Sequence, residues 1–452
     1  MHASLLTTTA ARAVNYLDSL RTRAVRPDDL AIKQLASLDV ALPENPSPAE
    51  DTIRLLDEIG SPATMAMAGP RFFGFVIGGT LPVTVAAQWL ATAWDQNTGL
   101  YRVTPSTAEI ERIALKWLLD LLHLPPDCGG AFVTGATMAN FTALAAARHS
   151  VLAKLGWNVE RDGLFGAPAI TVVVSEEVHP TLTKGLGLLG LGRERVVRVP
   201  VDRQGRMRAD ALPAISGPAI ICAQAGNVNT GAIDPLPEIA AYAKKHDAWL
   251  HVDGAFGLWA AASPDLRRQV VGIESADSWA TDAHKWLNVP YDSGVAFVRN
   301  RRALQDTMSI HAAYLPGSTI RDPSDFSPEL SRRARGVEIW AALRTLGRAG
   351  VADLISRSCR HARRFAEGLE SAGFEILNEV VLNQVLVGFG GKDHTERIIA
   401  AIQQEGTCWC GGTEWQGKSA MRISVCCWAT TEDDVERSLS AIIRAARAEV
   451  GG

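Results

Sequence analysis

Apolar positions along the chain change their spacing near residue 130 and again near residue 330. Residues 3–65 carry a helical periodicity, broken by a Pro-rich stretch. From 130 to 300, short apolar runs rich in Val and Ile alternate with helical segments, a pattern typical of a largely parallel sheet covered on both faces. The remainder begins with a long helical segment and ends in a strand and a helix. The pattern predicts an α/β fold with an N-terminal helical segment (1–65), a large domain (66–328) and a small α+β C-terminal domain (329–452).

Seven runs in the large domain are expected to form the strands of one mostly parallel sheet. They span 131–135, 169–175, 195–199, 219–225, 248–253, 278–282 and 294–298. A helix is expected over 107–122, where Ser106 and Glu109 match the S-x-x-E capping box. The aromatic, Gly-rich stretch 71–82 lacks either period, so a loop is expected there.

Composition narrows the classes of partner. The 452 residues carry a formal net charge of −4, which gives no reason to expect nucleic acid or an anionic membrane as partner. No apolar window is long enough for a membrane span, and no secretory signal is visible. Seven scattered cysteines fit reduced thiols in a cytoplasmic protein, and the spacing of Cys408, Cys410, Cys426 and Cys427 favours packing over a metal site. No metal is therefore expected.

The stretch KGLGLLGLG at 184–192 contains G-x-G-x-x-G, the spacing of a dinucleotide-binding turn. A nicotinamide oxidoreductase is the function that this spacing would favour. That fingerprint requires its first glycine directly after a strand, at the turn into a helix. Here the strand ends near Ser175, and Pro180 is suited to start a helix before the glycines arrive. Gly190 and Gly192 are therefore expected to end a helix, and the spacing is a coincidence.

Residues that could bind a ligand or take part in catalysis lie where three of the expected strands end. Asp253 closes the run AWLHVD, and His284-Lys285 follow the run SWATD. Gly135 ends AFVTG and opens a helix, so the N–H groups around Ala136 form an anion site. Ligands of parallel sheets bind outside the carboxyl ends of the strands. One anion site, one carboxylate and one lysine are thus expected at one sheet edge.

That combination is what pyridoxal phosphate requires. A lysine forms a Schiff base with its aldehyde, and a helix N-terminus holds its phosphate. A carboxylate keeps its ring nitrogen protonated, because a nearby negative charge favours the charged form of a base. The protonated ring then serves as an electron sink.

Several segments, in order from about residue 65 to 440, resemble those of the group II pyridoxal-phosphate-dependent decarboxylases, the aromatic-L-amino-acid decarboxylase-like family of fold type I. DSWATDAHKWLN resembles that family's cofactor-lysine segment, and HVDGAFG its H-V-D-A-A-[YF] segment. VTGATMAN is similar to its phosphate-binding turn, usually S-G-G-T-x-A-N. RFFGFVIGGTLP and ELSRRARGVEIWAALRTLG resemble its pocket loop and the helix after its catalytic loop. The resemblance implies a homodimer with active sites at the subunit interface.

The resemblance also implies a role for each matching residue. Lys285 would carry the Schiff base, Asp253 would pair with the ring nitrogen, Ala255 would line the ring and His179 would stack on it. The phosphate would be held at Gly135, Ala136 and Thr137, helped by Ser278, with His284 close to the cofactor or the substrate carboxylate. Asp282 stands where relatives have an asparagine near the phosphate, which puts an extra carboxylate there.

Tyr314 resembles the tyrosine of the family's catalytic loop, which protonates the α-carbon after CO2 leaves. Relatives that produce aldehydes have phenylalanine there, so Tyr314 favours plain decarboxylation. The substrate pocket would include Phe75, Val76, Ile77 and Gly78, where the family's Pro-Thr pair is missing. An aromatic or apolar L-amino acid is expected, because Phe72, Phe73, Phe75 and Trp94 supply aromatic surface. The alternative on the same fold and cofactor is a carbon–carbon lyase or aldolase, or an aminotransferase.

Overall fold

The structure is a computed structural model that describes residues 2–310 and 320–450. Within it the chain forms two compact units. Unit 1 comprises Met1–Gly79, Arg364–Ile376 and Leu386–Gly452, and unit 2 comprises Thr80–Arg363 and Leu377–Val385. This grouping joins the N-terminal residues to the C-terminal part of the chain, so the boundaries expected at residues 65 and 328 stay a prediction.

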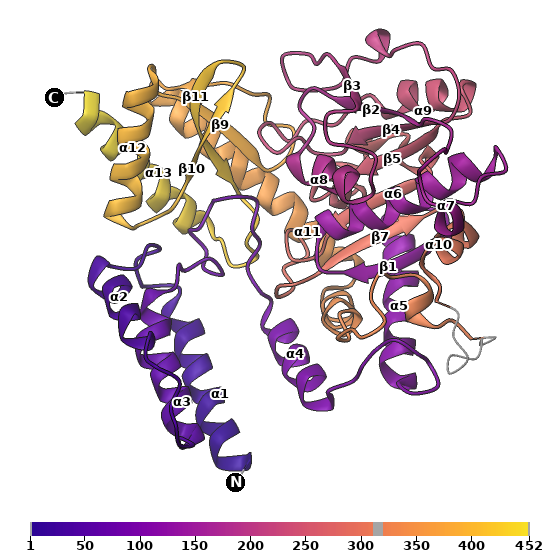
Figure 1. The fold of residues 1–452 in the computed structure, drawn as a ribbon. Helices are drawn as coiled ribbons and strands as arrows, with labels where there is room; N and C mark the ends of the chain where they lie inside the picture. The colour runs from indigo at the N-terminus through magenta and orange to yellow at the C-terminus, as the bar shows by residue number, and fades with distance from the viewer. Residues whose placement is uncertain (1, 311–319, 451–452) are drawn as a thin grey trace. The chain divides into compact units, whose positions relative to one another are not determined.

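Unit 2 is built on a seven-stranded sheet with the order β1-β7-β6-β5-β4-β2-β3 (Figure 1). Its strands are β1 (Gly129–Val133), β2 (Thr171–Ser175), β3 (Val196–Val199), β4 (Ala219–Gln224), β5 (Trp249–Asp253), β6 (Ser278–Asp282) and β7 (Gly294–Val298). β3, β2, β4, β5 and β6 run parallel to one another, whereas β7 is antiparallel to both β6 and β1. The predicted fold class is confirmed.

Burial on both faces explains the continuous apolar runs of these strands. Every residue of β1, β4, β5, β6 and β7 is buried, while the edge strand β3 is partly exposed. Helix α6 (Ala136–Ala153) lies against β1 and β4 to β7, and its small residues Ala139, Ala143 and Ala146 allow this close packing. Each predicted strand overlaps an observed one, and 278–282 and 294–298 have the observed bounds.

The remaining helices of unit 2 connect the strands or cover the sheet. They are α4 (Pro82–Trp94), α5 (Pro105–Leu121), α7 (Val159–Asp162), α8 (Pro180–Leu188), α9 (Leu236–Lys245), α10 (Arg301–Met308) and most of α11 (Gly336–Ser371). The expected capping box at Ser106 was wrong. Pro105 is the first residue of α5 and Thr104 its N-cap, so Ser106 already lies inside the helix, and Glu109 instead pairs with Arg112 at 2.6 Å.

The position of helix α8 shows that the G-x-G-x-x-G spacing at 184–192 is not a dinucleotide-binding turn. It begins at Pro180 with His179 as N-cap, and Gly185 and Gly187 lie within it. Gly190 and Gly192 follow its end with φ of 75° and 82°, the left-handed region that glycine adopts most readily. The turn after β2 is occupied by residues other than these glycines, as the sequence predicted.

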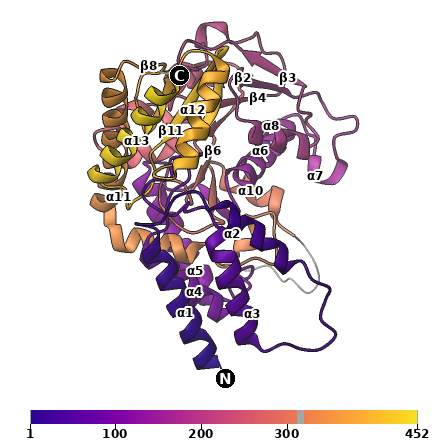
Figure 2. The same cartoon turned by 90° about the vertical axis from the view of Figure 1, so that its left-hand side faces the viewer.

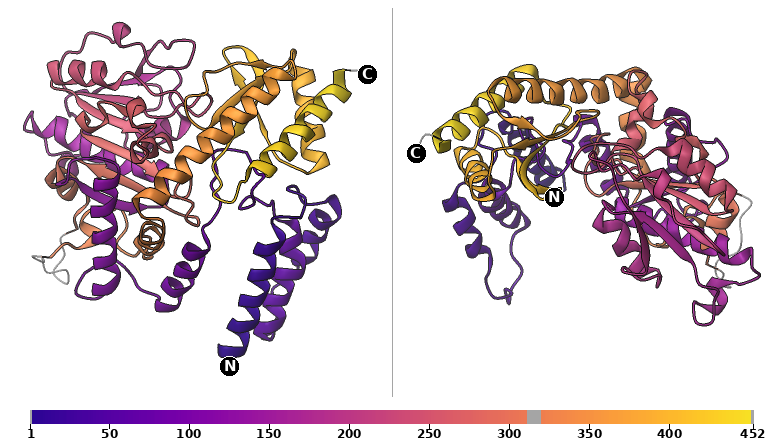
Figure 3. Two further views of the ribbon diagram at one scale, coloured as in Figure 1. Left: turned by 180° about the vertical axis from the view of Figure 1, so that it is seen from behind. Right: turned by 90° about the horizontal axis from the view of Figure 1, so that it is seen from above.

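Unit 1 contains a small sheet and two groups of helices. The sheet has the order β10-β11-β9-β8, formed by β10 (Gly411–Trp415), β11 (Lys418–Ser424), β9 (Gln384–Gly388) and β8 (Glu375–Ile376). Helix α12 (Lys392–Glu405) packs on β10 and β11 beside α13 (Glu432–Val450) (Figure 3). The N-terminal helices are α1 (His2–Ser19), α2 (Asp29–Gln34) and α3 (Ala49–Leu55), with α1 alongside α3 (Figure 2). No helix within residues 2–310 and 320–450 has the length and apolarity needed to cross a membrane.

Candidate active site

Three strand ends of unit 2 meet at one edge of the sheet. β7 is antiparallel to both β1 and β6, so β1 and β6 run in the same direction. β5 ends at Asp253 beside β6, which ends at Asp282. The carboxyl ends of β1, β5 and β6 therefore bring Gly135, Asp253 and the segment 282–285 to a common edge, as the sequence predicted.

Two glycines allow the start of α6 to approach β7 at this edge. A Cβ on Gly294, the first residue of β7, would lie 2.5 Å from both Cα and the carbonyl carbon of Gly135. A Cβ on Gly135 would in turn lie 3.2 Å from Cε1 of His284 and 3.3 Å from Oδ1 of Asp282. Side chains at these positions would push α6 away from the residues around Lys285.

Asp253 lies at the end of a chain of buried hydrogen bonds. Its Oδ2 accepts from Nδ2 of Asn140 at 3.0 Å, and its Oδ1 accepts from the N–H of Ala255 at 3.2 Å. Oδ1 of Asn140 lies 2.8 Å from Nε2 of His251, and Nδ1 of His251 lies 2.9 Å from Oγ of Ser278. Nε1 of Trp249 donates to the same Oγ at 2.8 Å.

The direction of this chain follows from its two fixed ends. Trp249 can only donate and an ionised Asp253 can only accept, so Ser278 donates to His251, which donates through Nε2 to Asn140. His251 is thereby neutral, and its complete burial lowers its pKa to about 3. Every donor points toward the carboxylate of Asp253.

The carboxylate of Asp253 is buried without a cation. The residue is 5% exposed, and no Lys, Arg or His within the described ranges forms an ion pair with it. Burying a lone carboxylate is costly unless a positive charge balances it. The site therefore suits a ligand that brings a positive charge to Asp253.

Asp282 has the opposite surroundings. Its Oδ1 accepts the N–H of Ala136, the first residue of α6, at 2.5 Å, and its Oδ2 lies 2.9 Å from Nζ of Lys285. Its side chain is 4% exposed, against 20% for Lys285. Its backbone is fixed separately, since its N–H donates to Ala255 and its carbonyl accepts from Trp259.

His284 is held in one tautomer. Its Nδ1 accepts the backbone N–H of Ser293 at 3.2 Å, so the proton of the neutral ring is on Nε2, 3.5 Å from Oδ1 of Asp282. Burial lowers the pKa of His284, with Asp282 opposing that shift. Tyr291 stacks on the ring with a centroid distance of 4.3 Å. His284 is thus a neutral donor beside the start of α6.

The expected role of Ser278 is corrected by its position. Ser278 is the first residue of β6, while Asp282, which contacts Ala136, is the last. Four residues of a strand span about 13 Å. Its fully buried hydroxyl is bonded to Trp249 and His251. Ser278 therefore stabilises Asp253 indirectly, through His251 and Asn140, and does not reach a phosphate at Ala136.

Other predicted residues lie in different places. His179 caps α8 after β2, with its Nδ1 2.7 Å from Oγ1 of Thr181, and its stacking role stays a prediction. Tyr314 lies outside the described residues.

The pocket-loop residues Phe75, Val76, Ile77 and Gly78 belong to unit 1, and their role in a substrate pocket stays a prediction. Phe72 and Phe73, expected to supply aromatic surface, are buried against Trp409 and Phe365 of the same unit.

The residues at the sheet edge fit pyridoxal phosphate. Helix α6 has no side-chain N-cap, and within the described residues the N–H groups of Thr137 and Met138 lack an acceptor. These N–H groups suit a phosphate. The cation-free Asp253 suits a protonated ring nitrogen, and Lys285 supplies the amine for the aldehyde.

Sequence reasoning missed the residues that support this arrangement. Asn140 is the last residue of the quoted VTGATMAN motif and lies one helical turn after Ala136, so it faces the same sheet edge. His251 precedes Asp253 by two residues and so points to the same face of β5. The helical spacing of Asn140 from Ala136 and the two-residue strand spacing of His251 from Asp253 could be seen in the sequence. The strand pairing that brings Ser278 beside His251 could not.

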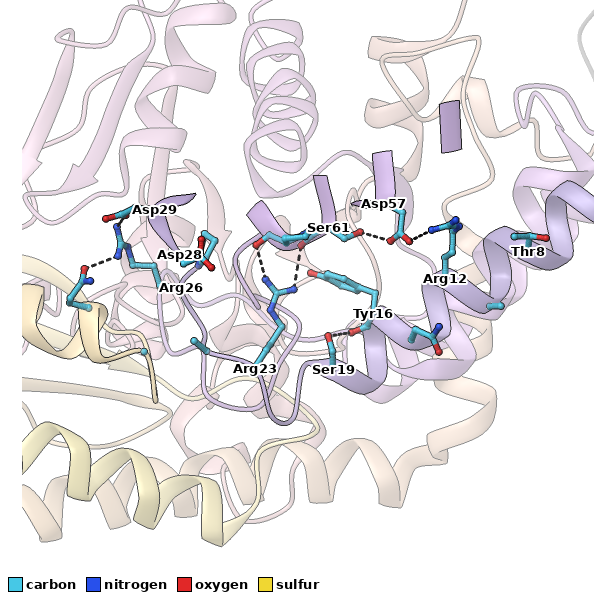
Figure 4. A pocket seen from close by; sticks show the side chains of 17 residues that line it. Thr8, Arg12, Tyr16, Ser19, Arg23, Arg26, Asp28, Asp29, Asp57 and Ser61 are labelled. Atoms are coloured by element: carbon cyan, nitrogen blue, oxygen red, sulfur yellow. Dashed lines mark hydrogen bonds and ion pairs between the residues drawn. The ribbon is translucent and has the colours of Figure 1, made fainter. Parts of the chain in front are cut away.

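A cavity lies wholly within unit 1, apart from the sheet edge. It has a volume of about 880 Å³ and lies among α1, the segment leading to α2, and residues near Asp57 (Figure 4). Arg12 pairs with Asp57, Arg26 pairs with Asp29, and Arg23 donates to backbone carbonyls (Figure 4). Because these charges are already satisfied, the cavity is a weaker candidate. No cluster of three or more His, Cys, Asp or Glu suited to a metal occurs in the described parts of the chain.

Comparison with known proteins agrees with this geometry. Residues 32–390 match the family model described as pyridoxal-dependent decarboxylase conserved domain. An aromatic-L-amino-acid decarboxylase of Bacillus atrophaeus is 29% identical over 371 residues, covering 79% of this chain and 74% of the relative. An acidic amino acid decarboxylase of Xenopus tropicalis is 30% identical over 359 residues, covering 76% and 69%.

Solved structures share the fold at lower identity. The crystal structure of Oryza sativa TDC with PLP and tryptamine has a TM-score of 0.90 and 22% identity, covering 99% of this chain and 97% of that one. Mouse CSAD has a TM-score of 0.91 and 22% identity, covering 98% of both chains. These likenesses concern the fold.

The buried His251 predicts a pH dependence of stability. Its folded-state pKa of about 3 lies below the ordinary value of 6.5, so the unfolded chain binds the extra proton first as the pH falls. Its contribution is complete above pH 6.5 and is lost as the pH falls from about 6.5 toward 3, by up to about 1.4 kcal/mol per pH unit. Denaturant unfolding at pH 7 and pH 5 should show a smaller loss for His251→Gln than for the wild type, by about 2 kcal/mol. Equal losses would contradict the assignment.

Proposed function

Because the chain belongs to the pyridoxal-dependent decarboxylase family, whose members use pyridoxal phosphate to decarboxylate amino acids, we propose that it converts an aromatic or apolar L-amino acid to the amine and CO2. The observation that carries the proposal is the buried carboxylate of Asp253, which has no cation in the described chain and lies at the same sheet edge as Lys285. A lysine beside a carboxylate reserved for a cationic ring is the arrangement that stabilises a carbanion at the substrate α-carbon.

When bound, pyridoxal phosphate would supply an electron-withdrawing ring for the electron pair that stays on the α-carbon when the carboxylate leaves as CO2. Lys285 binds the cofactor aldehyde through Nζ. Asp253 keeps the proton on the ring nitrogen, since the donors from Asn140 and Ala255 hold its carboxylate in place. Ala136 and Thr137 hold the phosphate with the start of α6, and His284 offers the proton on its Nε2 beside them.

The proposed substrate class is supported by an exposed aromatic side chain. Phe75 of the expected pocket loop is 62% exposed. Phe72 and Phe73 no longer contribute to the argument, because they are buried. The relatives include proteins named for aromatic and for acidic amino acids, so identity alone does not choose between these classes. A carbon–carbon lyase, an aldolase or an aminotransferase would use the same sheet edge and differ in the product.

We also propose that the protein is a homodimer with active sites at the subunit interface. The N-terminal helices bury few side chains within the described chain: α2 buries Ala31 alone, and α3 buries none of its residues. Leu6, Leu30 and Leu42 are 65%, 66% and 90% exposed. Short helices without a packed face are unstable in water, so a second copy is the natural cover for them.

The cysteines bear on location. All seven are buried and none forms a disulfide within the described residues, which supports the expected reducing, cytoplasmic environment.

Replacing Lys285 tests the cofactor assignment. Lys285→Ala should abolish the visible absorbance of the purified protein and reduce CO2 release from L-amino acids by at least about 10³-fold, because the covalent attachment is lost. Lys184→Ala, an exposed lysine of α8, is the matched control and should behave as the wild type. Visible absorbance that persists in Lys285→Ala would contradict the role of this lysine.

Replacing Tyr314 tests the reaction. After a screen of the proteinogenic L-amino acids for CO2 release, Tyr314→Phe should lower amine formation from the best substrate by about 10²-fold or more, because the proposed proton donor is removed. Amine and aldehyde are measured separately by chromatography. Unchanged amine formation would refute the role of Tyr314, and a product that retains its carboxyl carbon would favour the lyase or aminotransferase alternative.

The proposed dimer can be tested by substitutions in α1 and by measuring the mass of the protein in solution. The wild type should sediment at twice the chain mass of 48.5 kDa. Leu6→Arg should shift the equilibrium toward single chains, because it places a charge on the exposed apolar surface, whereas Thr7→Arg on the same helix should change it less. A single-chain mass for the wild type at micromolar concentration would refute the proposal.

A further inference from the structure

The carboxylate of Asp282 lies where the cofactor phosphate is proposed to bind. Its Oδ1 accepts the first N–H of α6 at 2.5 Å, and the same carboxylate pairs with Nζ of Lys285 at 2.9 Å. With a side chain only 4% exposed, it is shielded from water on nearly all sides. The chain thus supplies its own anion at the start of α6 and beside the cofactor lysine.

Lys285 is the one cationic side chain that pairs with Asp282 among the described residues. The other side-chain neighbour of Asp282, His284, is neutral, and Nζ of Lys285 would be bound to the cofactor aldehyde. Arg333 and Arg335 pair with Asp292, and Arg333 pairs also with Glu338. A phosphate carries nearly two negative charges at neutral pH, and like charges a few ångströms apart in a buried site repel strongly.

The local geometry allows the carboxylate to leave without moving the strand. The N–H of Asp282 donates to the carbonyl of Ala255 at 2.9 Å, and its carbonyl accepts from Nε1 of Trp259 at 3.0 Å. Only the side-chain torsions are free to change. The N–H of Ala136 is therefore released to a phosphate by a rotation of one side chain.

We propose that Asp282 sets the affinity for the cofactor by competing with its phosphate. Without cofactor, the carboxylate occupies the anion position of α6 and pairs with Lys285. Binding of pyridoxal phosphate displaces it from the N–H of Ala136 and leaves it as a repulsive neighbour. The protein consequently binds its cofactor less tightly, and exchanges it faster, than a chain with an uncharged residue at this position. The inference rests on the proposed placement of the phosphate at Ala136 and Thr137, and not on the identity of the amino acid.

The test is the affinity of the cofactor-free protein for pyridoxal phosphate. Asp282→Asn removes the charge, keeps the shape and adds an N–H donor for the phosphate. Its dissociation constant, from titration of the visible absorbance and of tryptophan fluorescence, should be at least about tenfold lower than that of the wild type. Loss of cofactor during dialysis should be slower by a similar factor. An unchanged or higher dissociation constant would overturn the proposal.

Inorganic phosphate provides a second readout that needs neither the aldehyde nor activity. It should raise the melting temperature of cofactor-free Asp282→Asn more than that of the cofactor-free wild type. An equal rise in both proteins would count against the proposal. If Asp282→Asn does not fold, Asp282→Ser removes the same charge and is measured in its place, with the same expected and contrary results.

Two controls separate the causes. Asp277 precedes the first residue of β6, at the end of the strand opposite to Asp282, and its carboxylate accepts the N–H of Leu250 at 2.8 Å. Asp277→Asn should leave cofactor affinity as in the wild type. Tighter binding by this variant as well would overturn the proposal.

Thr137→Pro removes one of the N–H groups proposed to bind the phosphate, in the first turn of α6 where proline is best tolerated, and should weaken binding. If it does not, the placement fails and the proposal falls with it. If it does while Asp282→Asn binds no tighter, only the role of Asp282 is refuted.

Discussion

The site depends on a buried carboxylate that is held by hydrogen bonds and has no cationic partner among the described residues. Asp253 receives donors from Asn140 and from the backbone of Ala255, and the donor chain behind Asn140 runs through His251 and Ser278 to Trp249. Hydrogen bonds to a charged form stabilise that form. Because all these hydrogen-bonding groups are neutral, they hold the carboxylate of Asp253 in place without neutralising its charge. The positive partner is left for the ring nitrogen of the cofactor to supply.

Asp282 shows how the same residue type acquires a different task from its neighbours. It ends β6 beside the end of β5, yet it meets the N–H of Ala136 and the amine of Lys285. Asp253 is thus reserved for a cation, whereas Asp282 has its positive partners already. The close approach of Gly294 to Gly135 decides this difference, since it places the start of α6 within reach of β6.

Much of the fold could be predicted from the sequence. The short, largely apolar runs located all seven strands of the large sheet, because strands buried on both faces are rich in apolar residues. Helix boundaries were less secure. The S-x-x-E pattern at Ser106 suggested a cap, but Pro105 lacks the N–H that a helix interior needs and fits the first helical position, so α5 starts earlier. Local patterns compete at helix ends, and the chain adopts the combination that also packs.

The sequence by itself determined the chemical types at the sheet edge: a lysine and a carboxylate at strand ends, a glycine before a helix, and the order in which they occur. Only the tertiary structure decided which of them meet. Strand pairing placed Ser278 beside His251 and away from Ala136, and the packing of α6 on the sheet placed Asn140 beside Asp253. The physical reason is that side-chain type is a property of the residue, whereas burial, partner and hydrogen-bond direction belong to pairs of residues far apart in the chain.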